Sequence, residues 1–238
     1  PYIMRLSSGF GAPGTPRLGV DFAGTVEAVG SRVTRFKPGD AVFGAKRGAF
    51  AEYVRVPEDQ SLVLKPDNVS FEQAASAPIA AVTALQALRD QGRLKPGQKV
   101  LINGASGGVG TFAVQIAKAL GAEVTGVCST GNVDLVRSLG ADAVIDYTHE
   151  DFTRGPRRYD AILDVPHFAT RSLADCRRVL TPKGTLVPAS NTRNRWIGGF
   201  SRILPARLMA PFVSHRIRAP EMASNPADLV ALAELVES

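Results

Sequence analysis

A glycine-rich loop between a strand and an amphipathic helix is the feature that most limits how this 238-residue chain can fold. Residues 99–103 form a short apolar strand pattern, and residues 102–111 read Ile-Asn-Gly-Ala-Ser-Gly-Gly-Val-Gly-Thr. Apolar side chains then recur at helical spacing as far as Leu120, where Gly121 is placed to end the helix. A strand, a tight glycine turn and a helix, in this order, are the context that a dinucleotide-binding fingerprint requires.

Within this loop, Ala105-x-Gly107-x-x-Gly110 is a variant of the Gly-x-Gly-x-x-Gly fingerprint with alanine at the first position. Gly107 has no side chain, so its backbone can approach a pyrophosphate, and Gly110 allows the helix to pack closely on the strand. The first N–H groups of the helix would then face the phosphates. The other interpretation is a glycine-rich turn without a ligand. A Walker-type triphosphatase is excluded, because no lysine stands between Gly110 and Thr111.

After the loop, short apolar strand patterns alternate with helical patterns. Strands are expected at residues 124–128, 143–146, 161–164 and 185–187, with Phe212 and Val213 as the candidate start of a sixth. A closing helix is expected at residues 228–236. This alternation predicts an α/β fold, namely a Rossmann-type doubly wound parallel sheet with helices on both faces.

The earlier part of the chain has a β pattern with close turns. Strands are expected at residues 22–29, 41–44 and 51–56. The Lys-Pro-Gly-Asp sequence at 37–40 suits a type II turn, and the whole segment indicates a small barrel-like β module. Residues 72–91 are mostly helical, with Pro78 as a kink or a first-turn residue. Because the pattern changes near residue 75, we predict two domains, residues 1–75 and 76–238.

The strand after the glycine loop discriminates between cofactors. An NAD-specific site usually places Asp or Glu about 20 residues beyond the glycines, to hold the ribose hydroxyls. Here that count lands on Cys128 and Ser129, neither of which is acidic. The hydroxyls of Ser129 and Thr130, with the N–H groups of a helix that Asn132 can cap, would accept a 2′-phosphate. The sequence therefore favours NADPH over NADH, although the loop contains no Lys or Arg.

Composition narrows the class of protein further. Apolar residues make up 45% of the chain and charged residues 21%, which indicates a globular protein and excludes a disordered one. No run of about 20 apolar residues is present that would span a membrane. Cys128 and Cys176 are the only cysteines, which excludes a disulfide scaffold and a four-cysteine zinc site. The chain suits a reducing compartment, and we expect it in the cytoplasm.

The formal net charge of +6 has a local source in residues 193–218. The arginines of this segment are Arg193, Arg195, Arg202, Arg207, Arg216 and Arg218, interrupted by Trp196, Phe200 and Leu204. A solvated helix face and loop is one interpretation, and weak association with an anionic membrane surface or a partner is the other. Nucleic acid is not expected as a partner, because no recognition module is visible.

Several short motifs follow one another along the chain. Residues 18–26 read Leu-Gly-Val-Asp-Phe-Ala-Gly-Thr-Val, residues 37–44 read Lys-Pro-Gly-Asp-Ala-Val-Phe-Gly, and residues 48–53 read Gly-Ala-Phe-Ala-Glu-Tyr. Together with the glycine loop, these motifs resemble the medium-chain dehydrogenase/reductase superfamily over nearly the whole chain. Residues 96–110 are similar to the zinc-independent quinone oxidoreductase branch, which includes zeta-crystallin-like proteins. The resemblance implies a partial GroES-like β domain beside the Rossmann domain. It also implies NADPH-dependent reduction of a small-molecule quinone or α,β-unsaturated carbonyl.

The resemblance also implies a set of site residues. Thr83 matches a threonine near the nicotinamide, whereas Ser129 and Tyr147 match positions that approach the adenosine 2′-phosphate. The candidate cofactor-binding residues are Thr83, Ser106, Gly107, Gly108, Val109, Gly110, Ser129, Thr130, Asn132 and Tyr147. The competing interpretations are a Thr83 bonded to its own helix backbone and a Tyr147 that fills a strand end. We assign no catalytic residue, because hydride transfer is the chemistry of the cofactor.

Departures from the superfamily pattern set further expectations. Val20 stands where zinc alcohol dehydrogenases carry histidine, so no zinc is expected. The opening and closing strands of the family would lie outside residues 1–238, so the chain is expected to be truncated at both ends. The resemblance implies a homodimer that pairs through the last Rossmann strand, near residues 211–213. The alternative to an enzyme is a non-enzymatic NADP-binding or interaction module.

Overall fold

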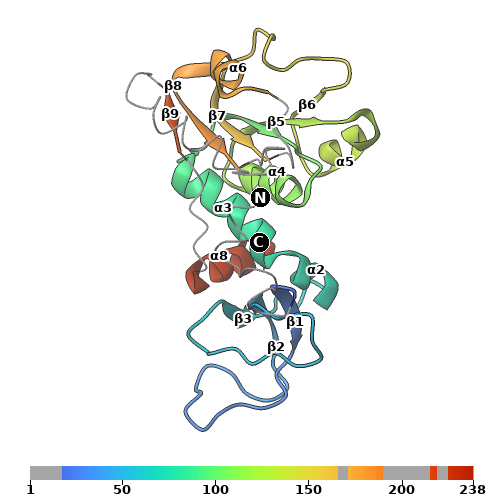
Figure 1. Cartoon of the computed structure of the whole chain (residues 1–238), viewed down its shortest axis with the longest axis vertical. Helices are drawn as coiled ribbons and strands as arrows, with labels where there is room; N and C mark the ends of the chain where they lie inside the picture. The colour runs from blue at the N-terminus through green and yellow to red at the C-terminus, as the bar shows by residue number, and fades with distance from the viewer. Residues whose placement is uncertain (1–17, 166–170, 190–214, 219–224, 238) are drawn as a thin grey trace, which may run out of the picture. The chain divides into compact units, whose positions relative to one another are not determined.

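The computed structural model describes residues 18–165, 171–189, 215–218 and 225–237 (Figure 1). Its described residues divide into two compact units. The larger unit begins at Ala84 and includes everything described as far as residue 218, and the smaller unit combines residues 18–83 with residues 225–237.

The larger unit is built on a six-stranded parallel sheet in the order β6-β5-β4-β7-β8-β9. The strands are β4 (Lys99–Asn103), β5 (Glu123–Cys128), β6 (Ala143–Asp146), β7 (Tyr159–Asp164), β8 (Leu180–Pro188) and β9 (Arg216–Ile217). In chain order this is the 3-2-1-4-5-6 arrangement of a Rossmann fold, in which the strand order reverses beside the first strand. The predicted doubly wound parallel sheet is confirmed.

Helices accompany this sheet and bury its apolar strands. They are η1 (Ala87–Gln91), α4 (Gly108–Ala119), η2 (Thr130–Asn132), α5 (Val133–Ser138) and α6 (Leu173–Arg178). Leu101, Ile162 and Leu186 have no more than 1% of their surface exposed, because they lie in central strands that are covered on both sides. Gly121 ends α4 with a φ of +77°. Glycine adopts this left-handed conformation at little energetic cost, whereas residues with a Cβ are strained there.

The smaller unit contains an antiparallel sheet in the order β1-β2-β3. Its elements are β1 (Asp21–Thr25), β2 (Ala41–Ala45), β3 (Leu62–Leu64), α2 (Phe71–Ser76), most of α3 (Pro78–Gln86) and α8 (Pro226–Glu237). Phe36, Val42 and Leu62 form its core. The predicted turn at residues 37–40 is present, with Gly39 at φ +92° and a bond of 3.2 Å from the N–H of Asp40 to the carbonyl of Lys37. Pro78 opens α3, as a first-turn residue does.

Two strand predictions in this unit are wrong. Residues 51–56 contain no strand, and the third strand of the sheet is β3 at residues 62–64 instead. The predicted strand at residues 22–29 is shorter in the structure and ends at Thr25. The N–H of Val26 donates to the carbonyl of Asp40, which belongs to the turn at residues 37–40 that precedes β2. The pairing between β1 and β2 therefore ends at this point.

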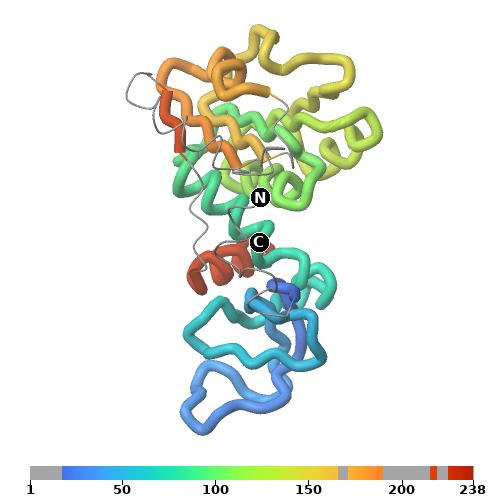
Figure 2. Tube along the Cα trace, in the orientation of Figure 1, coloured from blue at the N-terminus to red at the C-terminus, as the bar shows by residue number. Residues whose placement is uncertain are grey.

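Helix α8 returns to the smaller unit at the far end of the chain, as the red segment of Figure 2 shows. It contacts β3, and the side-chain amide of Asn68 donates to the carbonyl of Val236 at 2.8 Å. The proposed division of the chain at residues 75 and 76 stays a prediction.

Some expectations concern residues outside the described ranges. Phe212 and Val213 are among them. Of the arginines in the basic segment at residues 193–218, only Arg216 and Arg218 are described. Among the helices that the structure describes, none has the length and apolar character needed to cross a membrane.

Asp151 ties the loop after β6 to the start of α6. Its Oδ1 accepts bonds from the N–H and the hydroxyl of Thr153, at 3.0 and 2.7 Å, and from Arg171 Nε at 3.1 Å. Partial burial opposes the charge of this carboxylate. The hydrogen bonds from Thr153 and Arg171 outweigh that effect and lower the pKa from 3.8 to about 2.

The stability of the protein is expected to depend on Asp151 in acid. A lowered carboxylate pKa contributes stability that is present above about pH 4 and is lost as the pH falls through about 2. Asp151→Asn should therefore flatten the fall in unfolding free energy over that window, by up to about 1 kcal/mol for a pair that solvent partly screens. Urea unfolding between pH 6 and pH 2 measures this, and parallel curves for the two proteins would contradict it.

Candidate functional site

The glycine-rich loop leaves the end of β4 and is held against the neighbouring strand. The N–H groups of Gly104 and Ala105 both donate to the carbonyl of Val127 in β5, at 3.1 and 3.0 Å. The N–H of Gly107 then returns to the carbonyl of Gly104 at 3.0 Å. Gly104 has a φ of +87°, which lets the chain reverse tightly at the end of the strand.

Gly110 brings α4 close to this turn. A Cβ on Gly110 would lie 2.8 Å from the backbone of Ala105 and closer still to the carbonyl oxygen of Gly104. Gly108, by contrast, is exposed and faces open space. The bonding ladder of α4 begins with the N–H of Thr111 and the carbonyl of Gly107. The helix N–H groups before Thr111 are therefore free of that ladder and lie beside an exposed glycine backbone.

The predicted residues after β5 lie next to one another. Asn132 Nδ2 donates to Ser129 Oγ at 3.0 Å, and Thr130 is exposed. Asn132 precedes α5, as predicted, but its side chain makes no capping bond. The reason lies in its backbone: Asn132 belongs to the 3₁₀ turn η2 and has φ −113° and ψ 3°, whereas a capping residue is normally extended. Here the predicted capping role of Asn132 is wrong.

Tyr147 lies beside this segment, at the end of the next strand. Its N–H donates to the carbonyl of Cys128 at 3.1 Å, and its residue is 50% exposed. This exposure leaves the side chain open to a ligand, and the two interpretations of Tyr147 stay predictions. The structure thus brings Ser129, Thr130, Asn132 and Tyr147 to one edge of the sheet, where the glycine loop also begins.

Sequence reasoning missed a carboxylate at this edge. Asp146 ends β6 and is the register partner of Cys128, which ends β5. A bond with the Thr130 hydroxyl is the largest of the effects that lower the Asp146 pKa; burial opposes it, and bonds from Thr148 add to it. The sequence analysis found no acidic group near the segment after β5, because Asp146 is distant from it in the chain. The signal that could have revealed it is that Asp146 ends the predicted strand at residues 143–146, which would lie beside the strand at 124–128 in a Rossmann sheet.

A second missed feature is a buried polar pair between β4 and β7, where the strand order of the sheet reverses. Asn103 Nδ2 donates to Asp164 Oδ1 at 2.7 Å, and the two residues are 3% and 1% exposed. They are register partners at the carboxyl ends of the two strands. In open α/β sheets, ligands bind in the crevice outside this point.

Thr83 is on α3 and belongs to the smaller unit. Its hydroxyl donates to the carbonyl of Ile79 at 2.6 Å, and only 7% of the residue is exposed. This is the helix-backbone bond of the competing interpretation. Asp21 Oδ1 accepts from the N–H of the same Ile79 at 3.1 Å, and its pKa is raised because burial outweighs that bond.

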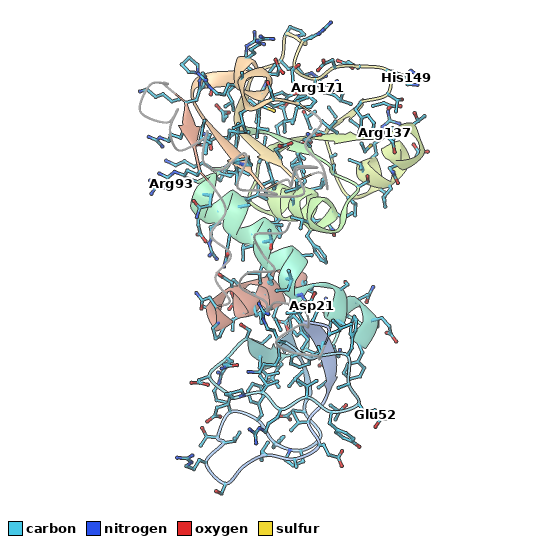
Figure 3. All side chains as sticks on the ribbon, in the orientation of Figure 1. Asp21, Glu52, Arg93, Arg137, His149 and Arg171 are labelled. Atoms are coloured by element: carbon cyan, nitrogen blue, oxygen red, sulfur yellow. The ribbon has the colours of Figure 1, made fainter. Side chains whose placement is uncertain are left out.

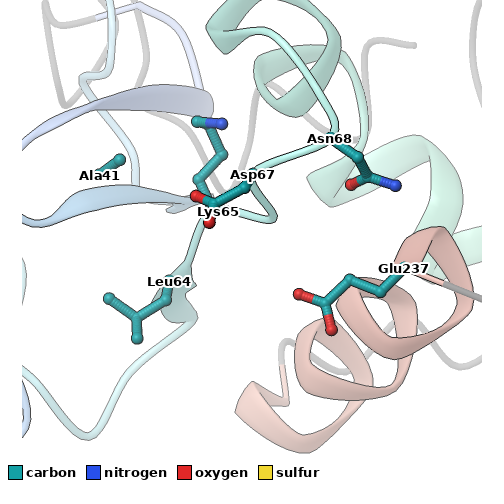
Figure 4. A pocket seen from close by; sticks show the side chains of 6 residues that line it. All are labelled: Ala41, Leu64, Lys65, Asp67, Asn68 and Glu237. Carbon is teal, nitrogen blue, oxygen red and sulfur yellow. The ribbon is translucent and has the colours of Figure 1, made fainter.

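A pocket of about 550 Å³ in the smaller unit contains none of the predicted site residues (Figure 4). It is lined by Ala41, Leu64, Lys65, Asp67, Asn68 and Glu237. The Lys65 ammonium donates hydrogen bonds to the backbone carbonyls of Pro66 and Val69. These bonds use its donors within the protein, so the ammonium is not directed at a ligand in the pocket. Of the features described, only the edge of the larger sheet combines a glycine loop, free helix N–H groups and converging polar side chains.

Comparison with known proteins assigns both parts of the chain. Residues 4–67 match the alcohol dehydrogenase GroES-like domain, and residues 108–198 match the family described as zinc-binding dehydrogenase. The structure of a quinone oxidoreductase from Coxiella burnetii is 31% identical, with a TM-score of 0.79 over 98% of this chain and 70% of that one. The chain belongs to the medium-chain dehydrogenase/reductase superfamily. Among other similar members, an NAD(P)H oxidoreductase of Mus musculus is 45% identical over 158 residues, 62% of this chain.

A trans-enoyl reductase of Aspergillus terreus is a further similar member of the superfamily, 43% identical over 161 residues, 63% of this chain. The chain spans 40% of the mouse protein and 44% of the fungal one, and thus less than half of these curated relatives. Membership explains why a three-stranded antiparallel sheet and a Rossmann sheet occur in one chain, because the two matched families cover these two parts.

Proposed function

We propose that this chain carries the cofactor site of a zinc-independent, NADPH-dependent oxidoreductase that transfers a hydride to a quinone or an α,β-unsaturated carbonyl. The observation that carries the proposal is the glycine loop at the carboxyl edge of a 3-2-1-4-5-6 sheet, with the first N–H groups of α4 beside it. Such N–H groups and the helix dipole favour a pyrophosphate.

The residues of the loop fit a dinucleotide. Ser106, Gly107, Gly108, Val109 and Gly110 would hold the pyrophosphate, since Gly107 and Gly108 expose backbone without side chains. Ser129, Thr130, Asn132 and Tyr147 would contact the adenosine ribose and its 2′-phosphate, and Thr83 would lie near the nicotinamide. When bound, NADPH supplies the hydride. The protein's part is to bind, orient and exclude water.

Four finer points belong to the proposal. NADPH is preferred because the segment after β5 offers hydroxyls and no acidic residue. Independence of zinc is supported by Val20, whose side chain cannot ligate a metal. In the described part of the chain, no three His, Cys, Asp or Glu side chains gather as ligands. A homodimer and a cytoplasmic location complete the proposal; the buried cysteines Cys128 and Cys176 form no disulfide, which suits a reducing compartment.

The proposed class of hydride acceptor is taken from the substrates that appear in the names of similar proteins. One is a quinone oxidoreductase and another a trans-enoyl reductase, so conjugated carbonyls are the shared chemistry. A quinone or enone can take its proton from solvent, so the protein needs only to place the acceptor against the cofactor.

Calorimetric titration with NADPH and NADH tests the cofactor half of the proposal. NADPH should bind at least about fivefold more tightly than NADH, roughly 1 kcal/mol. Addition of a naphthoquinone or a linear enone should then accelerate NADPH oxidation. If neither nucleotide binds to folded protein, the proposal is wrong. Binding without turnover of any acceptor would favour the non-enzymatic module.

A further inference from the structure

The end of β6 places a negative charge beside the segment proposed to meet the adenosine ribose. Cys128 and Asp146 are register partners at the ends of β5 and β6, so Asp146 lies across from the residue that precedes Ser129 and Thr130. The hydroxyls of Thr130 and Thr148 are 3.0 Å apart, and Thr148 in turn binds Asp146. A short hydrogen-bonded chain therefore links the carboxylate to the segment.

This carboxylate is fixed in place. Its Oδ1 accepts the N–H of Thr148 at 2.9 Å and the Thr148 hydroxyl at 2.7 Å. Its Oδ2 lies 3.8 Å from Nε2 of His149, which is labelled in Figure 3. The side chain is 16% exposed, and the lowered pKa keeps it ionised at neutral pH.

The chemistry of a fixed carboxylate differs for the two nicotinamide cofactors. A free ribose 2′-hydroxyl donates a hydrogen bond to it, which is how acidic residues of NAD sites act. A 2′-phosphate carries negative charge at this same position and is repelled. NAD sites usually supply the acid from the strand that follows the glycine loop; here that strand ends in Cys128, and the acid comes from the next strand.

We propose that Asp146 is a specificity-determining residue of the cofactor site, which weakens the preference for NADPH so that the protein also binds NADH. This inference rests on the proposed dinucleotide site. It predicts a modest preference in the native protein, because the hydroxyls of Ser129 and Thr130 favour the 2′-phosphate while Asp146 opposes it.

Asp146→Asn tests the inference with little change in shape. An asparagine oxygen can accept the same two bonds from Thr148, so the turn is kept and only the charge is removed. The matched control is Asp151→Asn. Asp151 makes the same turn with the N–H and hydroxyl of Thr153, at 3.0 and 2.7 Å, and lies outside the proposed site.

The ligands are NADPH and NADH, with adenosine 2′,5′-bisphosphate and 5′-AMP as probes that differ at the 2′ position and lack nicotinamide. Asp146→Asn should raise the ratio of NADPH affinity to NADH affinity about tenfold. The ratio of adenosine 2′,5′-bisphosphate affinity to 5′-AMP affinity should rise by the same factor. Asp151→Asn should leave both ratios within twofold of the native protein. Unchanged ratios in folded Asp146→Asn would overturn the inference alone. Failure of the native protein to bind any of the four ligands would overturn the proposed function with it.

Discussion

Replacing Gly110 with valine is expected to remove NADPH binding, with an affinity loss of at least about a hundredfold, and to destabilise the fold. The new Cβ would lie 2.8 Å from the backbone of Ala105 and nearer still to the Gly104 carbonyl, so α4 must move away from the loop. Overpacking of this kind costs about 1–3 kcal/mol. Calorimetric titration and urea unfolding measure the two effects.

Gly108→Ala is the matched control, because a Cβ at Gly108 meets open space. Its unfolding free energy should stay within about 0.5 kcal/mol of the native value. If Gly110→Val binds NADPH with native affinity, the loop is a glycine-rich turn without a ligand, and the central observation of the proposed function is lost.

Asn103→Leu is expected to lower the unfolding free energy by about 2–3 kcal/mol. The substitution removes the amide that donates to Asp164 at 2.7 Å, and the carboxylate then loses a donor in a site that is 1% exposed. A buried acceptor that loses its donor carries the cost of its desolvation without compensation, which is about 1–3 kcal/mol.

Asp164→Asn serves as the comparison, because its side-chain oxygen can still accept from Asn103. In urea unfolding at neutral pH, Asp164→Asn should lower the unfolding free energy by less than half as much as Asn103→Leu does. Equal losses for the two variants would mean that the pair acts through its volume, and the argument from hydrogen bonding would be wrong.

Local patterns of the sequence were sufficient for most of the larger unit. Strand β4, helix α4 and its end at Gly121 follow from apolar periodicity and from glycine, which are properties of neighbouring residues. Strands β7 and β8 are longer than predicted, because polar and charged residues at their ends interrupt the apolar pattern without ending the pairing.

What the sequence left undetermined depends on pairing between distant residues. Residues 51–56 have the alternation of a strand, yet β3 takes the edge of β2. Asp146 reaches Thr130 only because β5 and β6 are neighbours, which the sequence does not state. The Asn132 amide binds Ser129, and its backbone belongs to the turn η2, which a capping pattern in the sequence does not reveal.

The return of α8 to the smaller unit has a consequence for the order in which the protein is made. The bond between Asn68 and Val236 joins residues 168 positions apart, and the described part of the larger unit lies in the chain between them. A ribosome working from the N-terminus completes the described strands of the larger unit before it releases α8. The nascent smaller unit must therefore hold β3 without this helix while the described strands of the larger unit are being made, and the contact between α8 and β3 forms only after them.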